Sequence, residues 1–200
     1  MAEVSEKEMN ERFRRAWFDG GWRDRFMEKY VPPRIFSHVK KFYEQTDRTK
    51  YLNGINVEKG EGGYYSVPDS LQGRIVGYAV LFWIWERVYP TTWKRTFSVN
   101  SMSFQSWVDS FKGFDLQDFA RIERRTTYNT DLLLVYGLPT ERGTAWEMKE
   151  LRELIRNRSD LLKSTIWISE LPLRTWAEAL GDISLASYLT NDCGVILEST

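Results

Sequence analysis

The chain has 200 residues, and 42% of them are hydrophobic, a length and composition that suit one buried core. Its 28 basic and 28 acidic side chains cancel, so no overall charge draws the protein to nucleic acid or to a membrane, and such binding would need a local patch. The single cysteine, Cys193, and the single histidine, His38, exclude an internal disulfide framework and a Cys/His zinc site.

The first fifty residues predict helices. Ser5 and Glu8 form a capping-box pattern, which begins a helix that ends near Phe18. A second short helix is expected over Trp22–Tyr30, and Pro32–Pro33 suit the start of a third. Apolar residues then recur at helical spacing, namely Ile35, Phe36, Val39, Phe42 and Tyr43. We therefore interpret residues 1–52 as a helical N-terminal extension.

Two features of the sequence bear on localisation. The opening stretch MAEVSEKEMNERFRR mixes acidic and basic side chains without an apolar core, so it is not a secretory signal. The longest apolar run, Ile75–Trp85, has about half the length that a membrane span needs. We expect a soluble protein in a reducing cytoplasm.

The pattern changes after the glycine-rich segment NGINVEKGEGG (Asn53–Gly63), which reads as a loop or hinge. Five short runs predict strands: Tyr64–Val67, Thr96–Asn100, Asp131–Tyr136, Thr165–Ser169 and Gly194–Leu197. Four stretches between them predict helices: Arg74–Tyr89, Ser103–Phe111, Thr144–Arg158 and Leu173–Leu180. Strands that alternate with helices predict an α/β domain over residues 53–200, with a five-stranded parallel sheet covered on both faces.

Three consecutive blocks carry a family resemblance: DLLLVYGLPTERGTAWEMKELRELIRNR, STIWISELPLRTWAEALGD and ASYLTNDCGVILE. In order and spacing they resemble the DnaC/IstB branch of the AAA+ ATPases, which comprises helicase loaders and transposition helper ATPases. The resemblance covers about residues 50–198. It implies an AAA+-like sandwich of the P-loop NTPase kind, preceded by the helical extension.

The resemblance places YSVPDSLQGRI at the phosphate loop. Such a loop binds phosphate through backbone N–H groups curved by glycines, a lysine, and a hydroxyl that holds magnesium. Here Asp69 replaces a glycine and adds a negative charge, Gln72 replaces the lysine, and Gly73 replaces the hydroxyl. The altered positions of the pocket in this loop are Ser66, Asp69, Ser70, Leu71, Gln72 and Gly73.

The resemblance implies that three further functional sites of the ATPase reaction are also altered. Tyr136 and Gly137 follow the buried strand where acidic residues would hold magnesium and orient water. Glu170 replaces the asparagine that senses the γ-phosphate, and Tyr188 replaces the arginine offered to a neighbouring subunit. We therefore expect a pseudo-ATPase with no catalytic residues, no metal, no cofactor, and weak or absent nucleotide binding.

Two surfaces are candidates for partners. Phe13, Trp17, Phe18 and Trp22 lie in the segment by which the resembling loaders hold their helicase, although such rings also pack against the chain's own domain. Arg121, Arg124 and Arg125 form a small basic patch for weak nucleic-acid contact, or else the solvated face of a helix.

The resemblance thus favours a non-catalytic accessory protein of DNA replication or transposition that acts by binding a protein partner, such as a replicative helicase, a loader or a transposase. Two alternatives stay open: a weakly active ATPase that oligomerises on DNA, and a structural subunit of a larger complex. A chance resemblance in an unrelated α/β domain is a third. Measured ATP turnover and the identity of the co-purifying partner distinguish them.

Overall fold

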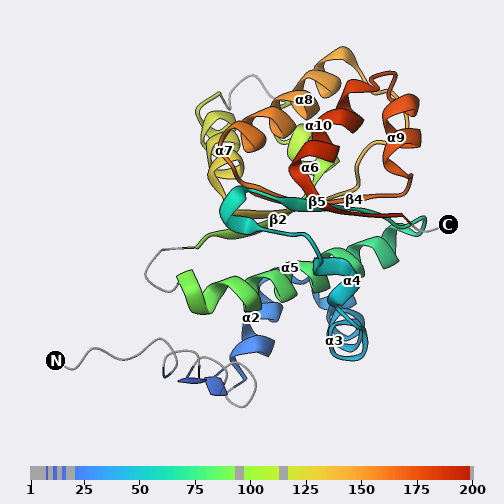
Figure 1. Ribbon diagram of the computed structural model, residues 1–200. Helices are drawn as coiled ribbons and strands as arrows, with labels where there is room; N and C mark the ends of the chain where they lie inside the picture. The colour runs from blue at the N-terminus through green and yellow to red at the C-terminus, as the bar shows by residue number, and fades with distance from the viewer. Residues whose placement is uncertain are drawn as a thin grey trace.

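A computed structural model describes residues 8, 11–12, 15–16, 21–92, 97–112 and 117–198. Its centre is a five-stranded sheet in the order β2-β3-β4-β1-β5, and every pair of neighbouring strands is parallel (Figure 1). The strands are β1 (Gly62–Ser66), β2 (Val99–Ser103), β3 (Leu132–Tyr136), β4 (Ser164–Ser169) and β5 (Cys193–Glu198). The prediction of a five-stranded parallel α/β sheet is confirmed.

Helices cover both faces of this sheet (Figure 1). On one face lie α2 (Trp22–Tyr30), η1 (Pro33–Ile35), α3 (Phe36–Gln45), α4 (Thr49–Leu52) and α5 (Ser70–Thr92). On the other lie α6 (Phe104–Asp109), α7 (Gln117–Asn129), α8 (Ala145–Asp160), α9 (Leu173–Ala179) and α10 (Ser184–Asp192). A short 3-10 turn, η2 (Val57–Lys59), precedes β1. Two apolar cores result, one on each face of the sheet.

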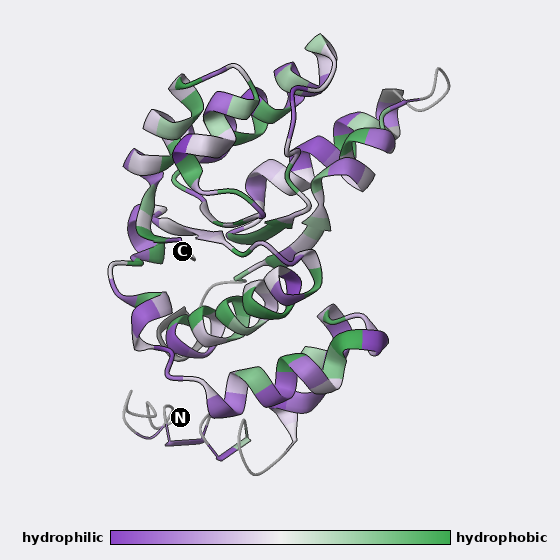
Figure 2. Cartoon of the chain, turned by 90° about the vertical axis from the view of Figure 1, so that its right-hand side faces the viewer, coloured by the Kyte–Doolittle hydropathy of each residue, from purple (hydrophilic) through white to green (hydrophobic). Residues whose placement is uncertain are grey.

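Helix α5 is apolar around most of its circumference because it is covered on two sides (Figure 2). One side packs on β3 and β4, and the other packs on α3. The ring of Trp83 in α5 stacks on Tyr43 in α3 at 5.7 Å, and its Nε1 donates to the carbonyl oxygen of Tyr43 at 3.3 Å. The described part of the N-terminal extension therefore shares a core with the sheet, and the boundary at residue 52 stays a prediction.

The segment predicted as a loop or hinge contacts the sheet through backbone atoms. Gly54 has φ +99°, and a Cβ atom there would lie 2.2 Å from the carbonyl oxygen of Gly194 at the start of β5. A Cβ atom on Gly194 would lie 1.9 Å from the carbonyl oxygen of Gly54. Only glycine at both positions allows this approach.

Arg158 in α8 joins three elements on the other face. Its side chain is only 1% exposed. Nε donates to the hydroxyl of Thr165 (2.7 Å), and Nη2 donates to the carbonyl oxygen of Ser164 (2.6 Å). Nη1 donates to the carbonyl oxygens of Thr127 (2.7 Å) and Thr130 (2.9 Å) at the end of α7. A buried cation thus binds the carbonyl groups at a helix C-terminus, where the helix dipole favours positive charge.

The structure also corrects several predicted elements. Helix α5 begins four residues before the predicted Arg74, and β2 begins at Val99 rather than at Thr96, which lies outside the described residues. Helix α10 was not predicted, and α7 was predicted only in part, as the helix face that is the alternative reading of Arg121, Arg124 and Arg125. Most of the predicted helix from Ser5 to Phe18 lies outside the described residues. Among the helices described, none is long and apolar enough to cross a membrane.

Candidate functional site

The carboxyl ends of the central strands meet at one edge of the sheet, which is where open parallel sheets bind their ligands. Ser66 ends β1, Tyr136 ends β3, and Ser169 ends the strand between them, β4. Helix α5 starts from the same edge at Ser70, after a connection of three residues. The structure therefore gathers the altered loop residues, Tyr136 and Gly137 at this edge.

Hydrogen bonds within the chain close the connection between β1 and α5. The amide of Val67 donates to the carbonyl oxygen of Ser169 (2.8 Å), so the strand pairing continues past β1. Asp69 caps the helix: its Oδ1 accepts from the amide of Gln72 (2.6 Å), and its carbonyl oxygen accepts from the amide of Gly73 (2.8 Å). Amides at a helix N-terminus attract anions, and here the carboxylate of Asp69 already occupies that place.

Gly73 allows α5 to pack closely on the sheet. A Cβ atom on Gly73 would lie 2.9 Å from Cγ2 of Ile168, and one on Gly77 would lie 2.8 Å from Cδ1 of Leu134. The two glycines let α5 lie close against β3 and β4, so a serine or threonine at position 73 would require a shift of the helix or of Ile168. Ser70, Leu71 and Gln72, the other members of the loop, are exposed.

The end of β3 carries an aromatic ring under a cation. The guanidinium carbon of Arg74 lies 5.0 Å from the centre of the Tyr136 ring. Gly137 follows with φ +65° and is exposed. Neither Tyr136 nor Gly137 offers a carboxylate, the ligand that magnesium prefers.

Hydrogen bonds fix the backbone that follows β4. The hydroxyl of Ser169 accepts from the amide of Leu171 (3.1 Å), and the hydroxyl of Tyr64 donates to the carbonyl oxygen of Leu171 (2.8 Å). Burial raises the pKa of Tyr64, so this phenol stays a donor at neutral pH. Glu170 is exposed, whereas the hydroxyl of Ser66 is buried and has no hydrogen-bond partner among the described residues.

No protein-family model matches this sequence, and no curated protein matches it. The structure is similar to that of the DnaC helicase loader, with TM-score 0.52 and 19% identity, over 86% of this chain and 95% of that chain. It is similar to DnaI with TM-score 0.54 and 11% identity, over 84% of each chain. It is also similar to the replication initiator DnaA bound to AMPPCP and single-stranded DNA, with TM-score 0.50 and 14% identity, over 86% of this chain and 48% of that chain.

The chain has an AAA+-like fold. Because the sequence identity to these structures is low, the similarity establishes the fold alone. Any argument about activity must come from the residues at the carboxyl edge of the sheet.

In this AAA+-like fold, Tyr188 lies on α10 and is 52% exposed. Ile183 on the same helix and Ile196 on the edge strand β5 are also exposed. A hollow of about 530 Å³ lies between α9, α10 and β5, with Ile183 and Ile196 in its lining. Tyr188 does not line this hollow, and its exposed side chain carries no positive charge to offer to a neighbouring subunit.

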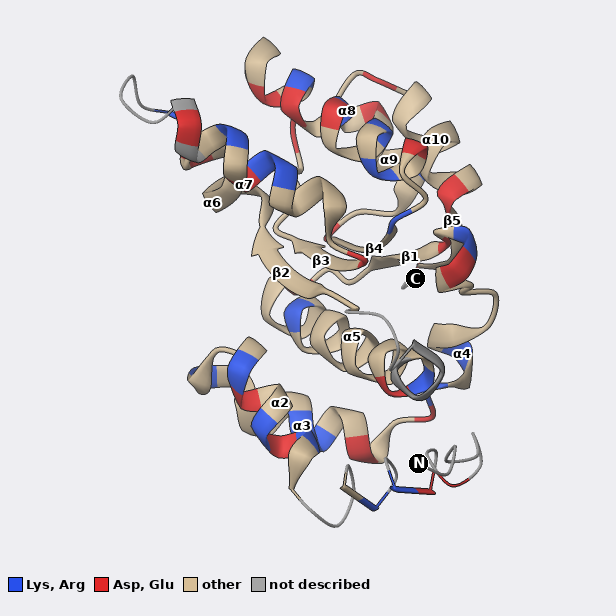
Figure 3. Cartoon of the chain, turned by 90° about the vertical axis from the view of Figure 1, so that its left-hand side faces the viewer, with Lys and Arg blue, Asp and Glu red and all other residues tan. Residues whose placement is uncertain are grey.

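Basic residues lie along α7 (Figure 3). The three arginines of the predicted patch, Arg121, Arg124 and Arg125, differ in their surroundings. Arg124 makes two hydrogen bonds to the buried carboxylate of Glu150 (3.1 and 2.7 Å), and its guanidinium lies 4.4 Å from the centre of the Phe111 ring. Arg121 and Arg125 are exposed. The side chain of Arg124 is thus engaged within the chain, and nucleic-acid contact by Arg121 and Arg125 stays a prediction.

Of the four aromatic residues predicted to bind a partner, the structure describes Trp22. It begins α2 and is 49% exposed. Phe13, Trp17 and Phe18 lie outside the described residues.

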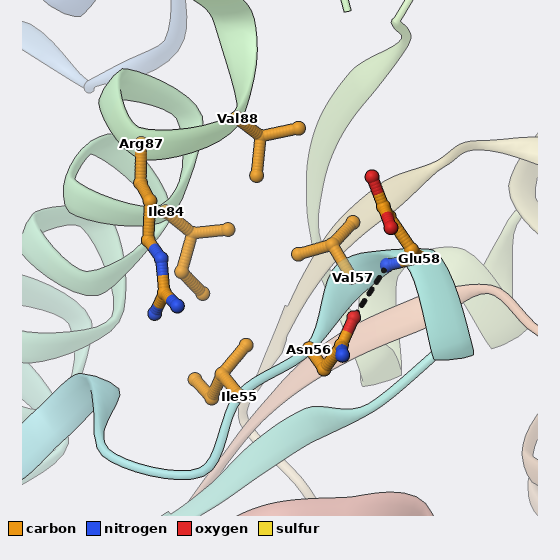
Figure 4. Close-up of a pocket in the computed structure, with 7 residues that line it drawn as sticks. All are labelled: Ile55, Asn56, Val57, Glu58, Ile84, Arg87 and Val88. Carbon is orange, nitrogen blue, oxygen red and sulfur yellow. Dashed lines mark hydrogen bonds between the residues drawn. The ribbon is translucent and has the colours of Figure 1, made fainter. Parts of the chain in front are cut away.

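A second hollow, of about 270 Å³, lies beside the later part of α5 (Figure 4). Ile55, Val57, Ile84 and Val88 give it apolar walls, and Asn56, Glu58 and Arg87 add polar groups. Asn56 Oδ1 accepts from the amide of Glu58 (3.1 Å), so this side chain caps η2. This hollow is formed by the segment before β1, and not by the strand ends where α5 begins.

Sequence reasoning missed Arg74. An arginine after the loop gives no signal by itself, because its partner Tyr136 lies far along the sequence, at the end of β3. Within the described ranges, no group of three His, Cys, Asp or Glu side chains could hold a metal ion.

Proposed function

We propose that this protein is a non-hydrolysing AAA+-like accessory protein of DNA replication or transposition, which acts by binding a protein partner. The observation that carries the proposal is the β1–α5 connection, where the carboxylate of Asp69 caps the helix that would otherwise face phosphate. A phosphate group placed there would meet the negative charge of Asp69.

The end of β3 supports the same proposal. Magnesium-assisted phosphoryl transfer needs a carboxylate to hold the ion and a residue to orient water. Tyr136 and Gly137 supply neither, and Arg74 places a positive charge over the ring at this end of the strand. The similarity to the structure of the DnaC helicase loader makes a replicative helicase the first partner to test.

We expect no magnesium-dependent release of phosphate from ATP, with or without single-stranded DNA. The reason is the combination of a self-capped α5 and a β3 end without an acid. The measurement is phosphate release by protein purified to constant specific activity. Turnover that survives purification and disappears in a Gln72→Ala variant would contradict the proposal.

Replacing Trp22 by alanine is expected to weaken partner binding by about 2 kcal/mol, because a few aromatic anchors dominate most interfaces. The measurement is the affinity for the purified replicative helicase of the same organism. Ile122→Ala is the matched control, since Ile122 on α7 is also an exposed apolar side chain, at 63%.

A melting curve of each variant accompanies this measurement. Equal affinity of the wild-type protein and Trp22→Ala would place the helicase-binding surface elsewhere. A fall in melting temperature without a change in affinity would mean that the ring stabilises the fold.

A further inference from the structure

Strand β5 is an edge of the sheet, and its outer side has no strand partner among the described residues. It pairs with β1 on its inner side and ends the strand order (Figure 1). Edge strands usually carry a lysine, a proline or an inward-pointing charge, which prevents pairing with another chain. Residues 193–197 (CGVIL) contain none of these. Gly54 approaches β5 at Gly194, so the open part of the edge begins at Val195.

One face of α10 continues this edge surface. The residues that line the hollow of about 530 Å³ beside β5 recur at helical spacing in and just before α10, namely Ile183, Ala186, Ser187, Thr190 and Asn191. Ile196 of β5 also lines the hollow and is 39% exposed. Val195 and Leu197 belong to the core on the opposite face of the sheet, so Ile196 points to the side of α10.

This surface has few charges. Residues 183–197 contain one charged residue, Asp192, although charged residues make up 28% of the chain. The carboxylate of Asp192 accepts from the hydroxyl of Ser159 in α8 (2.8 Å), on the other flank of α10. Arg174 and Glu198 also line the hollow, and both have partners within the chain. Depletion of charge around exposed apolar side chains is typical of the core of a protein interface.

We propose that this surface binds a second copy of the chain, with the two β5 strands paired antiparallel about a two-fold axis. An axis perpendicular to the sheet keeps each face on its own side, so only residues of the same face meet across the pair. In the register centred on Ile196, this residue lies opposite Ile196 of the second copy, and Val195 lies opposite Leu197 of the second copy. The exposed isoleucine is then covered, and these pairs bring no charges together.

The helices on this face fit the same arrangement. Helix α10 packs on both β1 and β5, and adjacent strands lie about 4.8 Å apart. A two-fold axis just outside β5 therefore sets the two α10 helices about 10 Å apart, a usual distance for packed helices. The net charge of the chain is zero, so two copies do not repel each other.

This contact differs from the one that the resemblance implies, in which a subunit offers the side chain at position 188 to its neighbour. Tyr188 is exposed on α10 but does not line the hollow. The dimer is also independent of the proposed function, because strand pairing requires neither a nucleotide nor a helicase.

Analytical ultracentrifugation of the full chain over a wide range of concentration tests the proposal. We expect a monomer–dimer equilibrium. Ile196→Lys should raise the dissociation constant of the dimer about ten-fold or more, because a two-fold contact places the new charge in the interface twice. Tyr188→Lys is the matched control and should leave the constant unchanged, since Tyr188 is an exposed ring on the same helix outside the hollow.

Cysteine cross-linking tests the register. Opposite residues of an antiparallel pair have Cα atoms about 4.5–5.5 Å apart, within the range of a disulfide. Ile196→Cys should therefore form a disulfide-linked dimer with a mild oxidant, whereas the wild-type protein and Tyr188→Cys should not. The wild-type protein controls for Cys193, because burial raises the pKa of this thiol and makes it less reactive.

A wild-type protein that stays monomeric at every concentration would overturn the proposal. A dimer that Ile196→Lys leaves unchanged, or that Ile196→Cys does not capture, would overturn it as well. Melting curves accompany each variant, and if Ile196→Lys fails to fold, the cross-link of Ile196→Cys decides.

Discussion

Replacing Arg158 by methionine is expected to lower the free energy of unfolding by about 3 kcal/mol or more. Methionine fills similar space but donates no hydrogen bond, so the carbonyl groups of Thr127, Thr130 and Ser164 lose their partner. These are backbone groups, which no change of side chain can remove. Burial lowers the pKa of Arg158 to about 9, which still leaves the guanidinium charged at neutral pH.

Two opposing effects decide the size of this loss. Methionine avoids the cost of burying a charge, which favours the variant. Each charge-assisted bond that it loses contributes about 1.5–3 kcal/mol, and the guanidinium makes several such bonds from α8 to α7 and β4. The lost bonds therefore outweigh the gain.

Urea unfolding measures this difference. Arg156→Met is the matched control, because Arg156 is on the same helix and its side chain is 78% exposed in an ion pair with Asp160. Surface pairs of this kind contribute about 0–1 kcal/mol. Similar losses in the two variants would show that Arg158 does not hold α7, α8 and β4 together.

Replacing Gly54 by alanine is the second change with a large expected effect, a loss of about 3 kcal/mol in the free energy of unfolding. A residue with a side chain at positive φ costs about 1–2 kcal/mol, and an added methyl group in a filled space costs about 1–3 kcal/mol more. The methyl group would meet the carbonyl oxygen of Gly194, which is backbone and cannot rotate away.

Gly21→Ala separates the two causes. Gly21 also has positive φ, +68°, but a Cβ atom there would have no atom of the described residues within 4 Å. We expect the free energy of unfolding of this control to fall by about 1–2 kcal/mol, which is the cost of the backbone conformation alone. Equal losses for both variants in thermal or urea unfolding would mean that the segment before β1 moves away from β5 at little cost.

The sequence was sufficient to predict the parallel sheet because its strands are short, apolar and separated by helices. The run LLLV in β3 is buried on both sides, as its lack of polar alternation indicated. The extent of helix α7 was not predicted, because the helix has few apolar residues: Ala120, Thr127 and Arg124 face the protein instead of an aliphatic stripe. Helix α10 was missed because it is short and follows α9 closely.

The candidate site was predictable as a set of positions, and less so as a set of contacts. The resemblance located Asp69, Gly73 and Tyr136, which the structure places at one edge of the sheet. The cap by Asp69 and the packing of Gly73 on Ile168 depend on where α5 begins and how close it lies to β4. The contact of Arg74 with Tyr136 joins segments that are distant in the sequence, so only the folded chain reveals it.

The place of β1 in the sheet affects the order in which the chain can fold. Gly63 in β1 pairs with Ile166 on one side and with Val195 on the other, and the hydroxyl of Tyr64 donates to Leu171, 107 positions later. Pairing over such distances slows folding. During synthesis, β1 and the apolar α5 leave the ribosome long before β4 and β5 exist, and exposed apolar surface of this kind favours aggregation. Helices α2 and α3 precede α5 and pack on the side that faces away from the sheet, so they are in place to shield that side of the nascent helix while the other side waits for its strands.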